Sequence, residues 1–485
     1  VKDLDYDGDD DDNEDDDDDD DHGRFGGAVG EGAYRSSVDL GQCGNQVGGQ
    51  FFSTIAEDIS TRSTGVSPKE NKDYVDTSLE TFFTQSESDR SRDGYPALPK
   101  ARAILVDMES KAVSQTMHKA KKSGKWAYSE SQGFSQKRGS GNNWANGFCI
   151  HGPNSEESVM NLVRKEVEKC DRLSGFMSLL SLAGGTGSGV GAFVTQSLRD
   201  EYPHSFILNQ VVWPYNTGEV IVQNYNAVLT LSHLHDTADA LIVMENDSLH
   251  KICAQLLNIK NISFADINCV IAHKLASILQ PCQAKDGAGT AKCDLGFLLE
   301  RLVAHPQYKL LTVKNIPQMS DVAKEFSVYQ WPGLMRNLRQ MLISDAPMEE
   351  GINWNVRPVA YRTESGHNCF NRSLSTLLVL RGRDIDGVNT AMFEDPAIYT
   401  PWMTPDMSSC VARQPRLFCE YDQAAALISN SQAGIRQLDR ILSKAWTMFT
   451  SRAYVHQYLK HGLTEEDFLD SFISLEKVVA SYNNL

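Results

Sequence analysis

One short segment, residues 181–192, most constrains what this chain can fold into. Four glycines fall within the six residues 184–189, and an apolar run at 176–182 leads into them. So many adjacent glycines are entropically unfavourable unless the backbone has to approach another group closely. A buried strand that ends in a glycine-rich turn and continues as a helix is typical of α/β proteins. The segment therefore predicts a strand end at which the backbone lies close to a second group.

The same alternation of strand, turn and helix runs through the first half of the chain. A turn at 41–45 precedes a predicted helix at 46–59, and another helix is expected at about 190–199. Continuous apolar runs are typical of parallel strands that are buried on both faces. The pattern predicts a doubly wound parallel α/β domain over residues 36–262. Its expected strands lie at residues 37–40, 103–106, 176–182, 206–212 and 240–244.

The second half of the chain predicts a different organisation. A long core helix is expected over residues 263–283, because apolar residues recur there at helical spacing. Residues 284–431 mix strand-like and helix-like segments, which predicts an intermediate α+β domain. Residues 432–485 predict a C-terminal helical hairpin whose last helix is capped by Thr464.

The N-terminal segment differs in composition from the rest. The whole chain carries a net charge of −18, and residues 1–21 alone carry −14 of it. We expect residues 1–35 to be a disordered acidic and glycine-rich extension, because like charges repel and little is available to pack. The spacing from Asp3 to Glu14 matches a calcium-binding EF-hand loop. A tract this rich in Asp satisfies that pattern almost by chance, and no amphipathic helix precedes it.

Composition argues against several classes of protein. The chain beyond residue 21 has a net charge of only −4, which is unlike a nucleic-acid-binding protein. No apolar stretch approaches the ~18 residues of a membrane span, and no basic segment leads into an apolar block as in a signal peptide. The ten cysteines include no C-x-x-C pair, which favours reduced thiols in the cytoplasm over disulfides or a zinc site.

Each of three interpretations of the glycine-rich turn leaves one feature of the sequence unexplained. A Walker-type phosphate loop needs a lysine after its glycines, and Val190, Gly191 and Ala192 follow instead. A dinucleotide-binding turn, as in an NAD-dependent enzyme, fits residues 187–192 as G-x-G-x-x-A. It also expects an acidic residue at the end of the next strand, and residues 206–212 contain none. A purely structural turn would not require so many glycines.

A fourth interpretation is a nucleotide held by several loops at once. Glycine-rich backbone ahead of a helix presents free N–H groups, and the helix dipole favours an anion there. Hydroxyl side chains in the glycine-rich turn add donors, and similar turns occur at 41–45 and 140–142. Asp107 and Glu109, at the end of a predicted strand, suit a magnesium ion. Loops that follow parallel strands meet in one crevice, so these segments predict one shared site.

Taken together, these loops resemble those of the tubulin family. The resemblance is carried by residues 41–46 (GQCGNQ), 141–145 (GNNWA) and 183–189 (AGGTGSG), in the family's order and at similar intervals. The last of these is similar to the family signature GGGTGSG, with Ala183 in place of the first glycine. Within the family, residues 213–219 (WPYNTGE) and 465–472 (EEDFLDSF) are most similar to the delta class. The resemblance implies a tubulin-like GTP-binding fold.

The resemblance also implies a binding site for GTP or GDP with Mg²⁺. Asp107 and Glu109 match the region that serves the magnesium ion and the outer phosphate, and Glu219 matches a ribose-side acid. Asn246 and Asn268 match two amides that read guanine, and Phe264 matches the ring that stacks on it. Taken alone, Asn246 also fits a helix cap and Phe264 a core residue. The residues implied at the phosphates are Gln42, Cys43, Ser140, Gly141, Asn142, Ser181, Ala183, Gly184, Gly185, Thr186, Gly187, Ser188 and Gly189.

The resemblance also implies that GTP hydrolysis requires an acidic side chain at one position, and this chain does not have one there. In the family, an acidic residue after the core helix activates water on the nucleotide of the next subunit, and Phe297 stands at that position here. A phenyl ring cannot orient water or accept a proton. Asp294 and Glu300 lie one turn to either side. We therefore expect at most weak or assembly-dependent GTPase activity. The alternative is a polymerising GTPase of the epsilon, zeta, α or β type.

The partners and location expected from the resemblance are those of the family. They are other tubulins, through longitudinal subunit contacts, and microtubule or centriolar components, with no nucleic acid. The expected location is the cytoplasm and its cytoskeleton, in centrioles and basal bodies and therefore in cilia or flagella. A nucleotide at the junction of two subunits would act as an interface and conformational element.

Overall fold

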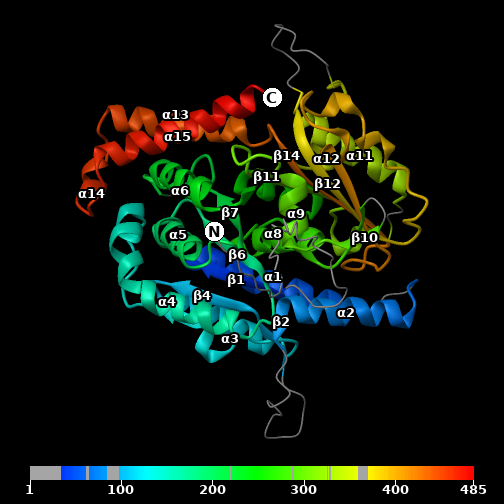
Figure 1. Ribbon diagram of the computed structural model, residues 1–485, viewed down its shortest axis with the longest axis horizontal. Coiled ribbons are helices and arrows are strands. Elements are labelled where there is room, and N and C mark those ends of the chain that lie inside the picture. The colour runs from blue at the N-terminus through cyan, green and yellow to red at the C-terminus, as the bar shows by residue number, and fades with distance from the viewer. Residues whose placement is uncertain are drawn as a thin grey trace, which may run out of the picture. The chain divides into compact units, whose positions relative to one another are not determined.

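A large sheet organises the part of the chain that the computed structural model describes, which is residues 34–61, 65–84, 98–218, 220–286, 289–324, 326, 329–358 and 370–485 (Figure 1). Its strands are β1 (Tyr34–Leu40), β4 (Ala103–Asp107), β5 (Gly133–Ser135), β6 (Leu173–Ser181), β7 (Phe206–Trp213), β8 (Ala240–Glu245), β9 (Gln283–Asp286), β10 (Gly289–Lys292), β11 (Leu310–Ile316), β12 (Ser373–Gly382), β13 (Ser409–Gln414) and β14 (Gln423–Ser431). They lie in the order β10-β9-β13-β12-β14-β11-β8-β7-β6-β1-β4-β5. The short strands β2 (Phe83–Thr84) and β3 (Lys100–Ala101) pair separately.

Helices connect and cover these strands. They are α1 (Gly41–Ser60), α2 (Pro68–Phe82), α3 (Ser110–Lys122), α4 (Gly152–Val167), α5 (Gly191–Glu201), α6 (Gln223–Thr237), α7 (Asn246–Lys251), α8 (Phe264–Leu279), α9 (Leu295–Leu302), α10 (Asp321–Lys324), α11 (Trp331–Ser344), α12 (Pro405–Ser408), α13 (Ile435–Thr450), α14 (Val455–Leu459) and α15 (Glu465–Asn483). Wider π-helical turns at Asn146–His151 and Thr186–Val190 lead into α4 and α5. None of the helices in the described part of the chain is both long and apolar enough to span a membrane.

The six strands from β8 to β5 are all parallel. Five of them were predicted from the sequence, and the short edge strand β5 was not. Alternate residues of each strand enter two different hydrophobic cores, because side chains of a strand point to opposite faces. Leu179 packs with α1 and α8 on one face, and Leu180 packs with α5 and α6 on the other. Helices therefore cover both faces of the sheet, and the predicted doubly wound α/β fold is confirmed.

The second half of the chain extends the same sheet instead of starting a separate one. β11 pairs in parallel with β8 through Leu310 and Leu241, and β14 then pairs antiparallel with β11. The C-terminal helices α13 and α15 pack over α6, where the rings of Phe468 and Tyr225 lie 5.1 Å apart (Figure 1). Thr464 caps α15 as predicted, through a reciprocal capping box with Asp467.

Three element boundaries differ from the sequence predictions. α1 begins at Gly41 and not at residue 46, because Gly41 takes a φ of +71° and completes the turn in one residue. β1 begins at Tyr34, so the predicted extension 1–35 ends earlier, and the Arg35 side chain is buried. α8 ends at Leu279 and not at residue 283, since Pro281 disfavours helix before it. Residues 1–33, with the EF-hand-like pattern, lie outside the described residues.

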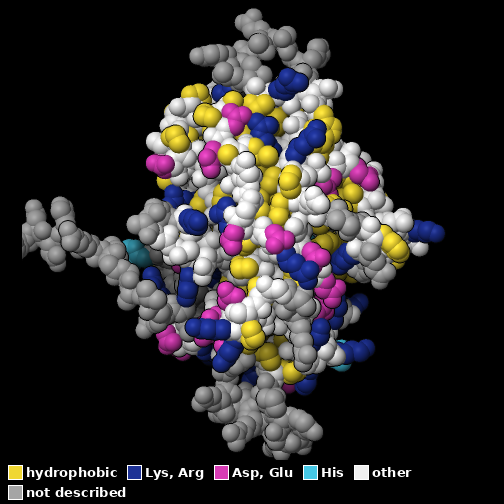
Figure 2. All heavy atoms as spheres, turned by 90° about the vertical axis from the view of Figure 1, so that its right-hand side faces the viewer, with side chains coloured by type: hydrophobic (Ala, Val, Ile, Leu, Met, Phe, Trp, Pro, Cys, Tyr) yellow, Lys and Arg dark blue, Asp and Glu magenta, His cyan; other side chains and the backbone are white. Residues whose placement is uncertain are grey.

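The surface of the described residues carries charges of both signs. On the face seen in Figure 2, Lys and Arg side chains are interspersed with Asp and Glu side chains. Interspersed charge of this kind produces no strong field of one sign on that face.

Candidate nucleotide-binding site

The strand register places the ends of the parallel strands at one edge of the sheet. Leu40, the last residue of β1, pairs with Val106 of β4. Ser181 at the end of β6 pairs with Val212, and the end of β7 pairs with Glu245 of β8. The segments that follow these strands therefore emerge side by side, which is where α/β sheets bind ligands.

Three of the predicted loops touch one another at this edge. A Cβ atom on Gly41 would lie 2.8 Å from the Gly187 nitrogen, so these backbones meet as only glycine allows. A Cβ atom on Gly185 would lie 2.4 Å from Ser140 Oγ, and Ser140 Oγ lies 3.0 Å from Thr186 Oγ1. The glycine-rich turn is thus a close-packed junction between loops, as its composition predicted.

Asn226, which sequence analysis did not identify, joins two of these loops. Its fully buried side chain donates to the carbonyl oxygens of Asn142 and Ala183, at 2.9 and 2.8 Å. Its Oδ1 atom accepts hydrogen bonds from the Trp144 backbone and the Tyr458 hydroxyl, at 3.1 and 2.6 Å. All four hydrogen-bonding positions of the amide are used. A polar residue on an otherwise buried helix was the only signal for this role.

The phosphate-side residues divide into a buried and an accessible set. Gly185, Gly187, Ser188 and Gly189 are buried, and the Ser188 hydroxyl bonds to the carbonyl oxygen of Gly184. The Ser188 hydroxyl donates within its own loop, and the Thr186 hydroxyl shares a hydrogen bond with Ser140 in which either oxygen can be the donor. The exposed or partly exposed residues are Gln42, Cys43, Gly141, Asn142, Ser181, Ala183, Gly184 and Thr186. A ligand at this edge would meet these residues and the backbone beneath them.

The two predicted magnesium residues lie at the same edge but in different surroundings. Asp107 is buried, and desolvation raises the pKa of its carboxyl to about 6. Glu109 is exposed at the start of α3, and a Cβ atom on Gly139 would lie 2.7 Å from its Oε1 atom. Among the described residues, no cluster of three or more acidic, His or Cys side chains could hold a metal. A magnesium ion here would need water and phosphate ligands as well, which is its usual preference.

The base-side amides are almost buried and lack hydrogen-bond partners in the described part of the chain. Asn246 and Asn268 are 9% and 6% exposed. Neither side chain forms a hydrogen bond with another described residue, and neither amide is among the fully buried polar atoms that lack a partner, so both keep some contact with solvent. Asn246 does not cap α7, because the preceding Glu245 is the N-cap residue and no side-chain cap forms. Two unsatisfied amides fit a ligand that carries both donors and acceptors, such as guanine.

The aromatic residue predicted beside the base is open to solvent. Phe264, the first residue of α8, is 62% exposed, so it is not the core residue that its spacing alone allowed. Its ring lies 6.5 Å from that of Tyr215, on the segment after β7. Asp247 holds that segment through the backbone and side-chain nitrogens of Asn216, at 2.9 and 2.8 Å. Tyr215 is a second residue that sequence analysis missed. Glu219 lies outside the described residues.

The distance between the two halves of the site follows from the sheet. β1 and β8 are separated by β6 and β7, and three strand spacings amount to about 14 Å. The close-packed loops lie at one end of this row, and Asn246, directly after β8, lies at the other. The arrangement suits an extended nucleoside di- or triphosphate.

Two further residues carry reactive groups: Cys43 lies at the site, and Asp294 lies at the start of α9, close to the opposite ends of the parallel strands. Burial raises the pKa of the Cys43 thiol to about 12, so this cysteine packs and does not act as a nucleophile. Asp294 caps α9, because its side chain accepts a hydrogen bond of 2.8 Å from the Phe297 nitrogen. The Phe297 ring lies 5.5 Å from the Arg301 guanidinium. Asp294 is therefore already engaged in the structure of the helix, and Glu300 is exposed.

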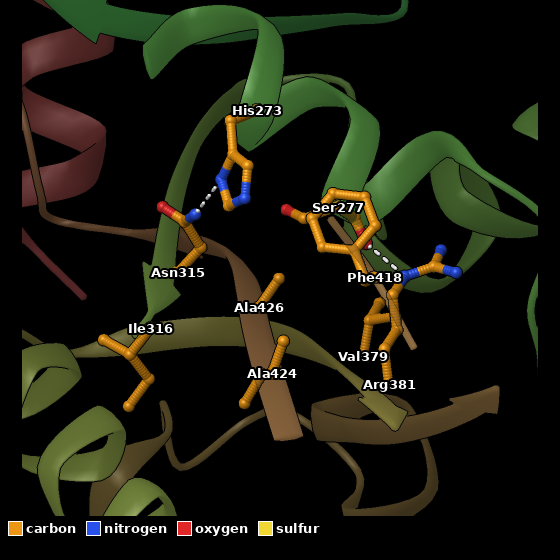
Figure 3. Close-up of a pocket in the computed structure, with 10 residues that line it drawn as sticks. His273, Ser277, Asn315, Ile316, Val379, Arg381, Phe418, Ala424 and Ala426 are labelled. Atoms are coloured by element: carbon orange, nitrogen blue, oxygen red, sulfur yellow. Dashed lines mark hydrogen bonds between the residues drawn. The ribbon is translucent and has the colours of Figure 1, made fainter. Parts of the chain in front are cut away.

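A separate cavity lies between α8, β11, β12 and β14 (Figure 3). His273 and Asn315 line it and are joined by a hydrogen bond of 2.9 Å, and the Arg381 guanidinium donates to the Ser277 carbonyl. Its volume is about 10 Å³, which is roughly the space for one water molecule. This cavity is too small for an organic ligand.

Comparison with known proteins agrees with this geometry. The GTPase domain of the Tubulin/FtsZ family matches residues 36–254, which contain most of the candidate site. A tubulin delta chain of Canis lupus familiaris is 52% identical over 460 residues, covering 93% of this chain and 99% of that protein. The Homo sapiens tubulin delta chain is 50% identical over 457 residues, with the same coverage. A tubulin beta-8 chain of Oryza sativa subsp. japonica is 27% identical over 453 residues, covering 92% of this chain and 93% of that protein.

The similarity extends over nearly the whole length of both chains and includes the loops that meet at the sheet edge. By its sequence and its fold, this chain belongs to the tubulin family, with tubulin delta chains among its relatives, and it carries the family's GTPase domain.

Proposed function

We propose that the row of loops between β4 and β8 binds GTP or GDP, with Mg²⁺ at the phosphate end. Gln42, Gly141, Asn142 and the backbone of residues 183–186 would face the phosphates. Asn246 and Asn268 would read the guanine edge, and Phe264 would stack on the base. Asp107 and Glu109 would hold the metal directly or through water.

One observation carries this proposal more than any other. Asn246 and Asn268 are nearly buried, and their amides bond to no described residue. The nitrogen and oxygen atoms of both amides are free of protein partners among the described residues and remain available to a ligand, and each amide offers a donor and an acceptor. Guanine offers acceptors and donors along one edge and a flat face for Phe264.

The proposal is tested by identifying the nucleotide that the purified full-length chain retains. We expect GTP or GDP in the wild type. Asn246→Ala should bind guanine nucleotide roughly tenfold or more weakly, because one lost base-reading amide costs about 1–3 kcal/mol. Titration with a fluorescent GTP analogue, with ATP as competitor, measures both affinity and base selectivity.

A matched control is available on α6. Asn224→Ala removes a partly buried amide whose nitrogen lies 3.8 Å from Met448 Sδ, away from the loops. It should leave nucleotide affinity unchanged. Retention of wild-type affinity and selectivity by Asn246→Ala would refute the assignment of the base site.

The second part of the proposal concerns assembly. We propose that the chain makes longitudinal contacts with other tubulins and works in the cytoskeleton, in centrioles and basal bodies of cilia or flagella. Its support is the extensive similarity to tubulin delta chains. Localisation of the tagged chain in ciliated cells, with cofractionation of other tubulins, tests this role.

We expect at most weak or assembly-dependent hydrolysis, and the engaged Asp294 favours the weak form. Asp294 is engaged as a helix cap, and Phe297 offers no base. GTP turnover per chain should therefore not rise with protein concentration. Asp294→Ala should leave turnover unchanged while costing about 0.5–2 kcal/mol of stability. Turnover that rises with concentration and collapses in Asp294→Ala would favour an assembly-coupled GTPase instead.

A further inference from the structure

Cys282 and Cys293 face each other at the base of the β9–β10 hairpin. Gln283 of β9 pairs with Lys292 of β10, so the next residues outward form the following cross-strand pair. The Cys293 nitrogen donates to the Cys282 carbonyl oxygen at 3.2 Å. Directly opposed residues on antiparallel strands point to the same face with Cβ atoms about 4.5–5.5 Å apart. Only a small movement separates this from the ~3.5–4.5 Å that a disulfide requires.

The two thiols influence each other's ionisation. The neighbouring Cys293 lowers the pKa of the Cys282 thiol, and Cys282 together with burial raises the pKa of the Cys293 thiol. Cys282 is buried and Cys293 is partly buried. The pair thus combines one sulfur that favours the thiolate form with a protonated neighbour.

Two buried guanidinium groups lie beside this pair. Arg35 donates to the carbonyl oxygens of Leu279 and Cys293, at 3.2 and 3.3 Å. Arg381, 2% exposed, donates to the carbonyl oxygens of Gln280 and Pro281, at 2.6 and 3.1 Å. Neither guanidinium forms an ion pair within 4 Å of a carboxylate among the described residues, although burial lowers the pKa of Arg35 and the Asp294 carboxylate opposes this shift. Buried cations favour an anionic sulfur nearby.

We propose that Cys282 and Cys293 are a peroxide-sensitive thiol pair that forms a reversible disulfide across the base of this hairpin. Cys282, whose thiol has the lowered pKa, is the reacting sulfur, and Cys293, the more exposed of the two, is the resolving one. The proposal does not depend on nucleotide binding. The disulfide would have a local structural effect, because it would link the segment after α8 covalently to the segment before α9.

The chemistry balances with hydrogen peroxide as the oxidant. The Cys282 thiolate attacks one peroxide oxygen, an S–O bond forms, the O–O bond breaks, and hydroxide leaves and is protonated to water. The Cys293 sulfur then attacks the sulfenic sulfur of Cys282. An S–S bond forms, the S–O bond breaks, and the hydroxyl leaves as water with the proton of Cys293. Two thiols are oxidised and one peroxide is reduced to two waters.

Peptide mapping of the intact full-length chain tests the proposal directly. Trypsin cleaves after Lys274, Lys285, Lys292 and Arg301, which places the two cysteines on separate peptides, 275–285 and 293–301. After brief peroxide treatment and non-reducing digestion, we expect these peptides as one linked species, lighter by two hydrogens than their sum. Dithiothreitol should separate them. In Cys293→Ser, dimedone should instead label Cys282 as the sulfenic acid.

Another pair of cysteines provides the control. Cys253 and Cys269 also lie near each other, but burial raises the pKa of both thiols. They should stay reduced under the same treatment, and Cys269→Ser should leave the 275–285/293–301 linkage unchanged. The proposal is overturned if this linked species fails to form, or if Cys293 links to Cys410 or another cysteine instead.

Discussion

Replacing Asp58 by alanine is expected to lower the free energy of unfolding by about 3–5 kcal/mol, the usual cost of leaving one member of a buried ion pair alone. Asp58 Oδ2 lies 2.8 Å from Arg416 Nη1, and both side chains are 2% exposed. The carboxylate also accepts from the Cys419 nitrogen, the Tyr74 hydroxyl and the Gln280 amide. These partners lie on α2, after α8 and between β13 and β14. Asp58 therefore fixes the end of α1 to three separate parts of the fold.

Urea unfolding of the variants at constant protein and nucleotide concentration measures this effect. Glu201→Ala breaks the exposed pair with Arg164, whose side chains are 32% and 52% exposed, and should cost less than about 1 kcal/mol. Asp58→Ala combined with Arg416→Met should recover part of the loss, because no buried charge is then left alone. Equal losses in Asp58→Ala and Glu201→Ala would mean that the buried pair contributes no more than an exposed one.

The sequence predicted those elements whose formation depends on residues close together in the chain. The parallel strands followed from continuous apolar runs, and the start of α15 followed from Thr464, whose cap involves residues only three positions apart. The glycine-rich turn was predicted to meet another group, and it meets Gly41 and Ser140. In each case the signal lies within a few residues, or in a run of glycines that is favourable only where backbones approach closely.

Features that depend on distant partners were not predicted. Asn226 bonds to Asn142 and Ala183, and its acceptor faces Tyr458, more than two hundred residues away along the chain. No spacing rule marks such a residue. The pairing of β11 with β8, which joins the strands of the predicted α+β region to the parallel sheet, was not predicted for the same reason. The start of α1 depended on the single backbone angle of Gly41, which composition does not reveal.

Asp39 should make the protein less stable as the pH rises from about 4 to 7. It lies in β1 beneath the first turns of α1, fully buried, and burial raises the pKa of its carboxyl from 3.8 to about 7. The nearby Ser37 and Tyr128 hydroxyls oppose this shift, and Oδ2 has no partner among the described residues. A folded-state pKa above the unfolded value means that the folded chain binds more protons. The contribution of Asp39 to the free energy of unfolding is therefore largest at low pH. It decreases as the pH rises, until Asp39 is also ionised in the folded state.

Asp39→Asn removes this titration and should flatten the pH dependence. Between pH 5 and pH 8 the wild type should lose about 2–3 kcal/mol more of its free energy of unfolding than the variant does, from a shift of about three pKa units. Urea unfolding at a series of pH values measures the difference, with the exposed Asp439→Asn as a control that should follow the wild type. Parallel profiles for the wild type and Asp39→Asn would mean that Asp39 ionises normally. Asp39 lies beneath α1, which carries Gln42 and Cys43, so this titration takes place under the helix that begins the proposed nucleotide edge.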